Sequence, residues 1–97
     1  MPTFILSLSW TDQGIRAIKE WPKRGTAARA LAKKVGVDIK HVYVTAGEGD
    51  VLAIVEAASG DNIAKFAMAQ GVLGNVRTRT ALAWTEAEAA KLIAELP

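Results

Sequence analysis

Hydrophobic and polar residues alternate along the first part of the chain, from Thr3 to Trp10. One side of this segment carries Phe4, Leu6, Leu8 and Trp10. A period of two is typical of a β-strand with one apolar face, so we predict a strand here. Thr11 and Asp12 offer side-chain oxygens for a helix start, and a helical segment follows up to Gly36. We expect an interruption at Trp21-Pro22, because the residue before a proline avoids helical backbone angles.

The middle of the chain predicts a β-hairpin. Residues 37–46 and 51–57 are rich in β-branched residues, and the turn between them, residues 47–50, contains two glycines. Alternation along the first of these strands places Val42 and Val44 on one face. The other face is expected to carry Ile39, His41, Tyr43 and Thr45.

A second helix is predicted after Ser59, with Ile63 and Phe66 facing inward and Gly71 at its end. A fourth strand is expected over residues 74–84. Its two faces separate the residues Val76, Thr78, Thr80, Leu82 and Trp84 from Asn75, Arg77, Arg79, Ala81 and Ala83. The chain ends in an amphipathic helix that follows a capping-box pattern, Thr85 to Glu88.

The resulting order is β-α-β-β-α-β with an added C-terminal helix. Right-handed crossovers place the two main helices on one side of a four-stranded antiparallel sheet, an α+β fold. The other face of the sheet is then bare and of mixed character, which is typical of a surface that meets a partner. We therefore predict a single domain over residues 1–97 that associates with itself into at least a dimer.

Composition narrows the classes of protein further. The 97 residues include no cysteine, which excludes disulfides and thiolate chemistry. The sequence has no signal-peptide pattern and no apolar run near the roughly 20 residues of a membrane span, so we expect a cytoplasmic protein with no membrane partner. Net charge is +5 over residues 1–40 and −3 over residues 41–97. The basic residues fall on helical sequence without interleaved aromatics, so we expect a solvated helix face and no specific nucleic-acid binding.

Few residues are arranged for chemistry. His41 is the only histidine, so one chain cannot form a multi-histidine metal site, and we expect no metal and no cofactor. A triad of Ser7 or Ser9 with His41 and Asp50 has no nucleophile-elbow motif to support it. Glu48 and Asp50 are close in sequence, but such a pair in a turn is usually solvated or caps the backbone. No catalytic residue is assigned.

Strand parity gives the candidate ligand-binding residues. It places His41, Tyr43, Arg77 and Arg79 on the bare face of the sheet. Arginine offers paired donors to flat anionic oxygens, so this set predicts a site for a small anionic ligand. The alternative is structural: the arginines pair with Glu48, Asp50 or Glu56 across strands or subunits, and Tyr43 is an interface aromatic.

Two segments are similar to a known family. Ser9-Trp10-Thr11-Asp12-Gln13-Gly14-Ile15-Arg16 resembles the first strand-to-helix junction of the GYD domain family, within the dimeric α/β-barrel superfamily. Gly71-Val72-Leu73-Gly74-Asn75-Val76-Arg77-Thr78 resembles the start of that family's last strand. Between them, a third segment, Gly47-Glu48-Gly49-Asp50, sits where the family has its Gly-Tyr-Asp signature, with Gly49 in the place of the tyrosine. The resemblance implies a ferredoxin-like fold whose sheets pair into a barrel between subunits, and it implies no single activity.

Three functional hypotheses follow. The first is a homo-oligomeric small-ligand-binding or structural assembly module with no chemistry of its own. The second is a cofactor-independent enzyme of the monooxygenase or isomerase kind that uses His41 and Tyr43, with the arginines in support, on a small anionic or aromatic substrate. The third, nucleic-acid binding through the basic first helix, has the least support.

Overall fold

The computed structural model describes residues 1–97. It has two layers, one β-sheet and the helices that pack on it. The elements in chain order are β1 (Thr3–Trp10), α1 (Asp12–Arg16), the 3-10 turn η1 (Ile18–Glu20), α2 (Trp21–Lys34), β2 (Val37–Val44), β3 (Val51–Ala57), α3 (Gly60–Val72), β4 (Val76–Ala83) and α4 (Glu86–Ala94). The predicted order of strands and helices is therefore confirmed.

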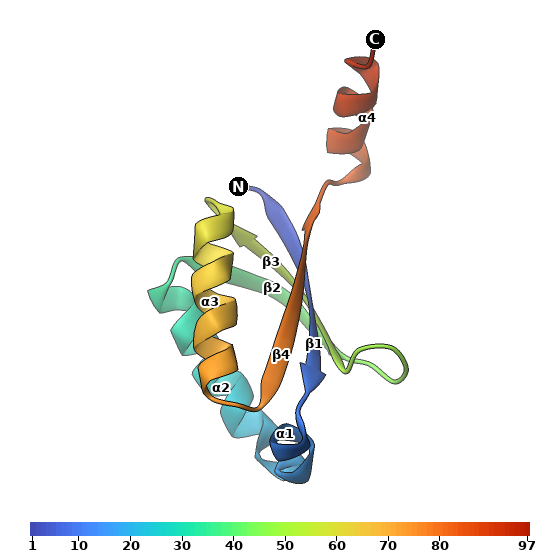
Figure 1. Cartoon of the computed structure of the whole chain (residues 1–97). Coiled ribbons are helices and arrows are strands. Elements are labelled where there is room, and N and C mark those ends of the chain that lie inside the picture. Colours follow the sequence, from blue (N-terminus) through green and yellow to red (C-terminus); the bar gives the residue numbers. More distant parts are fainter.

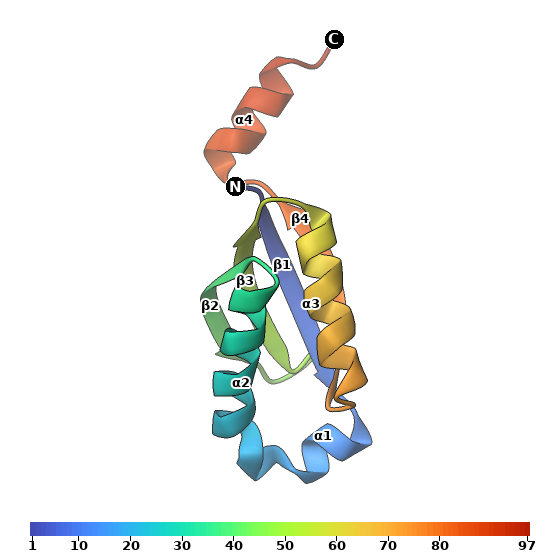
Figure 2. The ribbon, with the colours of Figure 1, turned by 90° about the vertical axis from the view of Figure 1, so that its left-hand side faces the viewer.

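The four strands form one antiparallel sheet in the order β2-β3-β1-β4. Both long helices cover the same face: α2 packs along β2 and α3 along β4 (Figures 1 and 2). The opposite face of the sheet carries no element of the chain (Figure 1). This is the α+β arrangement with one bare sheet face that right-handed crossovers predict.

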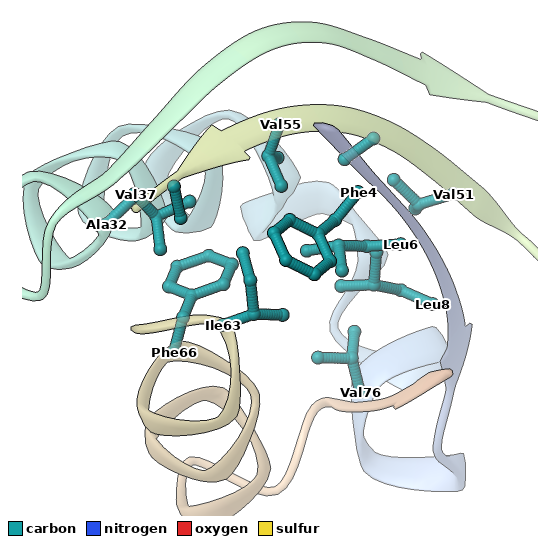
Figure 3. Close-up of a cluster of buried hydrophobic side chains, with 12 residues drawn as sticks. Phe4, Leu6, Leu8, Ala32, Val37, Val51, Val55, Ile63, Phe66 and Val76 are labelled. Carbon is teal, nitrogen blue, oxygen red and sulfur yellow. The ribbon is translucent and has the colours of Figure 1, made fainter. Parts of the chain in front are cut away.

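The core lies between the sheet and the helices. On β1, Phe4, Leu6 and Leu8 are buried, while the alternate residues are not. β3 repeats this pattern from Val51 to Ala57. Ile63 and Phe66 of α3 point into this cluster (Figure 3) and are almost fully buried. The buried face of each strand, formed by every second residue, thus packs against the inward face of α3, as predicted.

Side-chain caps start α1 and α4. The Thr11 hydroxyl accepts a hydrogen bond from the Gly14 N–H at 3.1 Å, and Thr85 and Glu88 form a reciprocal capping box. Ser59 precedes α3 but makes no capping bond to its backbone; its hydroxyl donates to the Asn62 side chain instead. A break in the helical segment is present, but it lies before Trp21-Pro22: the 3-10 turn Ile18–Glu20 separates α1 from α2. Trp21 itself has helical angles, φ −49° and ψ −45°, because Pro22 falls in the first turn of α2, where a proline is tolerated.

One face assignment in β2 was wrong. Ile39 pairs with Val55, and His41 pairs with Ile54, so Lys40 is an extra residue at a β-bulge. The bulge reverses the parity along the strand. Ile39 therefore lies on the helix side together with Val42, and a regular alternation could not have placed both there.

The predicted end of α3, at Gly71, was also wrong. The helix continues past Gly71 to Val72, and the left-handed residue that redirects the chain is Gly74, at φ +83°. Gly71 has ordinary helical angles, so a glycine near a helix end was not enough to mark the stop. The fourth strand accordingly begins at Val76, two residues later than predicted.

The C-terminal helix α4 stands clear of the sheet and of the other helices (Figures 1 and 2). None of its residues is buried. Leu92 and Ile93 of its apolar stripe are exposed to solvent, as are Leu96 just after the helix and Trp84 just before it. The chain therefore presents an amphipathic helix that covers nothing within its own fold.

Candidate functional site

The bare face of the sheet has an apolar centre and polar edges. Ile54 of β3 is paired with Ile5 of β1, which is paired in turn with Ala81 of β4. The neighbouring row runs from Tyr43 through Leu52 and Ser7 to Arg79. The central residues of these rows lie open to the side that no helix covers.

His41 and Tyr43 lie together at the β2 edge of this face. Their rings are stacked, with centroids 6.4 Å apart and an interplanar angle of 20°. The bulge at Lys40 is what returns both residues to the bare face after Ile39. Tyr43 is 55% exposed, so its ring is free to contact a partner.

Arg77 and Arg79 lie at the opposite edge, on β4. Their partners on β1 are Ser9 and Ser7, which confirms the face that parity predicted for them. Neither arginine forms an ion pair within the chain. The Arg77 side chain extends past the edge of β4 toward α3. Its Nη1 lies 3.5 Å from the position that a Cβ at Gly71 of α3 would occupy.

The four predicted ligand-binding residues therefore share a face but not a pocket within one chain. β2 and β4 are separated by β3 and β1, which places their side chains roughly 14 Å apart at the usual strand spacing. Parity could identify the common face, but the strand order decides which residues on it are neighbours. The residues form two separate pairs: His41 and Tyr43 lie at the β2 edge, and Arg77 and Arg79 lie at the β4 edge.

The acidic turn has a structural role. The Asp50 carboxylate accepts a hydrogen bond from the Trp10 N–H at 2.9 Å, and the Asp50 N–H donates to the Leu8 carbonyl at 3.0 Å. Gly49 has φ +83°, a conformation that a tyrosine at this position would adopt only with strain. Asp50 is thus committed to the backbone, while Glu48 is exposed.

A cleft of about 290 Å³ opens on the other side of the sheet, between α2, α3 and the strands. None of the four predicted residues lines it; Arg24 and Arg29 do. Arg24 Nη2 donates to the carbonyls of Gly14 and Ala17 at 3.1 and 3.2 Å, while its Nε and Nη1 are buried without a partner. The solvated helix face predicted for these basic residues holds for the exposed Arg29 but not for the half-buried Arg24. The small residues of α2 beside them, Gly25, Ala27 and Ala28, were the missed signal.

Electrostatic interactions elsewhere are few. Lys40 Nζ lies 2.8 Å from Asp38 Oδ2, and this hydrogen-bonded ion pair raises the pKa of the exposed lysine. No group of three or more histidine, aspartate or glutamate side chains is arranged to hold a metal ion. The helices are all too short or too polar to cross a membrane.

Comparison with known proteins places this geometry in a family. The GYD domain model matches residues 4–93. Over 81 residues the chain is 31% identical to the glutamine synthetase and cystathionine beta-lyase binding protein of Thermus thermophilus, covering 82% of this chain and 85% of that protein.

A solved structure shares the fold. It is a feast or famine regulatory protein from M. tuberculosis in complex with L-methionine, with a TM-score of 0.56 and 19% identity. The match covers 88% of this chain but only 51% of the regulator, so the chain spans about half of its length. The ferredoxin-like arrangement predicted for the sheet and helices is confirmed by this likeness.

Proposed function

Because the chain belongs to the GYD domain family, we propose that it is a homo-oligomeric binding module with no chemistry of its own. The observation that carries this proposal is the uncovered sheet face, whose centre is formed by Ile5, Leu52 and Ile54. Apolar surface of this kind is removed from water when a second copy packs against it. The Thermus relative is named for binding two enzymes, which supports binding as the role of the fold.

The two polar edges support one particular arrangement of the copies. A two-fold axis along the strands turns the second sheet over, so that its β4 lies above β2 of the first. Tyr43 then faces Arg79 of the partner subunit, and His41 lies near the same edge. This arrangement brings the His41–Tyr43 pair of one copy to Arg79 of the other in two symmetric sites, each suited to a small anion or an aromatic acid, while the Arg77 guanidinium lies at the rim, toward α3.

The detached helix α4 supports association independently. It has only nine residues, and an isolated helix of that length is marginal in water even with a good cap. Its exposed stripe of Leu92, Ile93 and Leu96 needs a surface to pack on. A second copy provides that surface, since α4 projects beyond the sheet of its own chain (Figure 1).

Charge reversal with rescue tests this arrangement. Arg79→Glu places a carboxylate against the Tyr43 edge of the partner subunit, without changing the fold of the exposed strand, and should weaken the dimer by tenfold or more. The double variant Tyr43→Lys/Arg79→Glu should recover the wild-type dissociation constant, since lysine then faces glutamate across the interface. Analytical ultracentrifugation measures both constants.

The matched control is Arg29→Glu, on the helix side of the sheet, which should leave the dimer unchanged. Within one chain residues 43 and 79 are too far apart to pair, so rescue cannot arise inside a monomer. A wild-type dimer that tolerates Arg79→Glu, or a double variant no tighter than the single one, would contradict the proposed axis.

A further inference from the structure

The cleft on the helix side exists because α2 does not close over the sheet. The residues of α2 beside the cleft include Gly25, Ala27 and Ala28, which have little side chain to fill the space. Val44 belongs to the helix side of β2, where its partner is the buried Val51, yet it is 56% exposed. The gap is therefore a consequence of small residues on one helix, and Phe66 of α3 forms its far wall.

The lining of the cleft is apolar with a basic component. Its volume of about 290 Å³ lies just below the usual range for ligand pockets, roughly 300–1,000 Å³. The strands contribute side chains such as Leu8, Val42 and Val44 to its floor. Two arginines, Arg24 and Arg29, belong to the lining, and no aspartate or glutamate does. A ligand that fits this chemistry has an apolar body and one negative charge.

Arg24 contributes donors that lack an acceptor. One nitrogen of its guanidinium, Nη2, donates to the carbonyls of Gly14 and Ala17 at the end of α1. The remaining nitrogens, Nε and Nη1, are buried and form no hydrogen bond. A buried donor without an acceptor destabilises the folded state, and the cost is larger on a charged group. Binding of an anion beside Arg24 would remove this cost.

We propose that the cleft binds a small monocarboxylate with an apolar body. The carboxylate pairs with the Arg24 guanidinium, which turns slightly toward the cleft as the ligand enters, and Arg29 adds positive charge to the wall. The apolar body lies over Leu8 and Val42. A zwitterionic amino acid is disfavoured, because the lining has no carboxylate for its ammonium group and offers only the amides of Gln70 and Asn75 beside two arginines. This site is separate from the bare sheet face and does not depend on dimerisation.

Three probes of nearly equal size test the proposal by isothermal titration calorimetry on the full chain. Octanoate carries the required charge, octanamide is its neutral counterpart, and L-2-aminooctanoate adds an ammonium group. Octanoate should bind at least about tenfold more tightly than either of the others, a difference of about 1.4 kcal/mol. If octanoate gives no binding up to low millimolar concentration, or binds no better than octanamide, the proposal is overturned.

Two variants locate the site. Ala28→Leu fills the cleft from α2, one helical turn after Arg24, and keeps the guanidinium, so it should abolish octanoate binding and leave the fold at least as stable. Arg24→Met should remove the preference for octanoate over octanamide. Arg24 also donates to the carbonyls of Gly14 and Ala17, so Arg24→Met could fold poorly. In that case the result for Ala28→Leu decides the test.

Two controls exclude binding elsewhere. Lys33→Met removes a positive charge from α2 outside the cleft, and Val72→Ser removes an apolar side chain that is 85% exposed on α3. Both should bind octanoate as the wild type does. Octanoate binding that survives in Ala28→Leu but is lost in Val72→Ser would assign it to the surface of α3 and refute the proposal.

Discussion

The carboxylate of Asp50 accepts a hydrogen bond of 2.9 Å from the backbone N–H of Trp10, forty positions earlier in the chain. The Asp50 N–H also donates to the carbonyl of Leu8. The aspartate thereby extends the contact between β1 and the hairpin beyond the last paired residues, Leu8 and Val51. An acid held in this way is part of the backbone scaffold, which accounts for its place at the end of the Gly47–Asp50 turn.

Replacement of Asp50 should therefore affect stability. Asp50→Ala leaves the part-buried Trp10 N–H without an acceptor, and we expect a loss of about 1–3 kcal/mol in the free energy of unfolding. Asp50→Asn keeps an oxygen in place and should lose clearly less. Urea denaturation followed by circular dichroism measures both. Equal losses in the two variants would show that the hydrogen bond to Trp10 is not what matters.

Gly14 is the point of closest approach between α1 and the start of β4. A Cβ at this position would collide with the carbonyl oxygen of Asn75, the same oxygen that accepts the Thr11 N–H at 3.0 Å. The Gln13 side chain also bonds to Leu73 and Asn75 across this junction. Since the obstacle is backbone, it cannot rotate out of the way.

Gly14→Ala should accordingly destabilise the protein by about 1–3 kcal/mol, the usual cost of overpacking. Gly25→Ala is the matched control, because its Cβ would meet only the Arg29 side chain at 3.6 Å and alanine favours the helix. We expect this control to gain about 0.5–1 kcal/mol. Thermal denaturation should move the two melting temperatures in opposite directions, and a shared direction would contradict the account.

Much of the fold was predictable because local signals agreed with one another. Alternation in β1 and β3 gave strands whose bounds match the structure. The two segments that resemble the GYD family, residues 9–16 and 71–78, are the ones that Gln13 and Asn75 tie together. Their unusual composition therefore reflects a close backbone contact. The bulge at Lys40 was not predictable, since no residue around it departs from a normal strand.

The candidate site was predictable only in part. Parity placed His41, Tyr43, Arg77 and Arg79 on one face, because side-chain direction depends on position along a strand. Whether they meet depends on strand order and, in the proposed dimer, on a second copy, and neither is encoded locally. The cleft beside Arg24 was missed for a related reason. It exists because the side chains around it are small, and no sequence motif marks such a cavity.

The capping box of α4 predicts a pH dependence. The Thr85 N–H donates to Glu88 Oε1 at 2.8 Å, and this bond, followed by the Thr85 side-chain bond, lowers the pKa of Glu88 below its usual value. A lowered pKa in the folded helix means that the contribution is present above the ordinary glutamate pKa and is lost as pH falls through the lowered one.

NMR chemical shifts of residues 86–94 should therefore report fraying of α4 on acidification through the pKa of Glu88. Glu88→Gln keeps an acceptor for the Thr85 N–H but does not titrate, so its helix should be insensitive over the same range. If α4 of this variant frays with the same midpoint as the wild type, the capping box is not the titrating element.

Removal of both β4 arginines separates binding from assembly. In Arg77→Met/Arg79→Met the side chains keep much of their apolar length, so the oligomer should be retained. Binding of benzoate, detected by NMR at His41 and Tyr43 in the wild type, should be lost. If the arginines instead form ion pairs buried between subunits, the variant should dissociate, because their carboxylate partners would be left unpaired at a cost of about 3–5 kcal/mol.

The mass of the wild-type protein in solution tests the central claim most directly. One chain has a mass of 10.3 kDa, and in the proposed dimer a second copy covers its bare sheet face and packs on α4. Light scattering coupled to size-exclusion chromatography should return twice that mass, or a higher multiple, at micromolar concentration. A mass of 10.3 kDa at every accessible concentration would contradict the account.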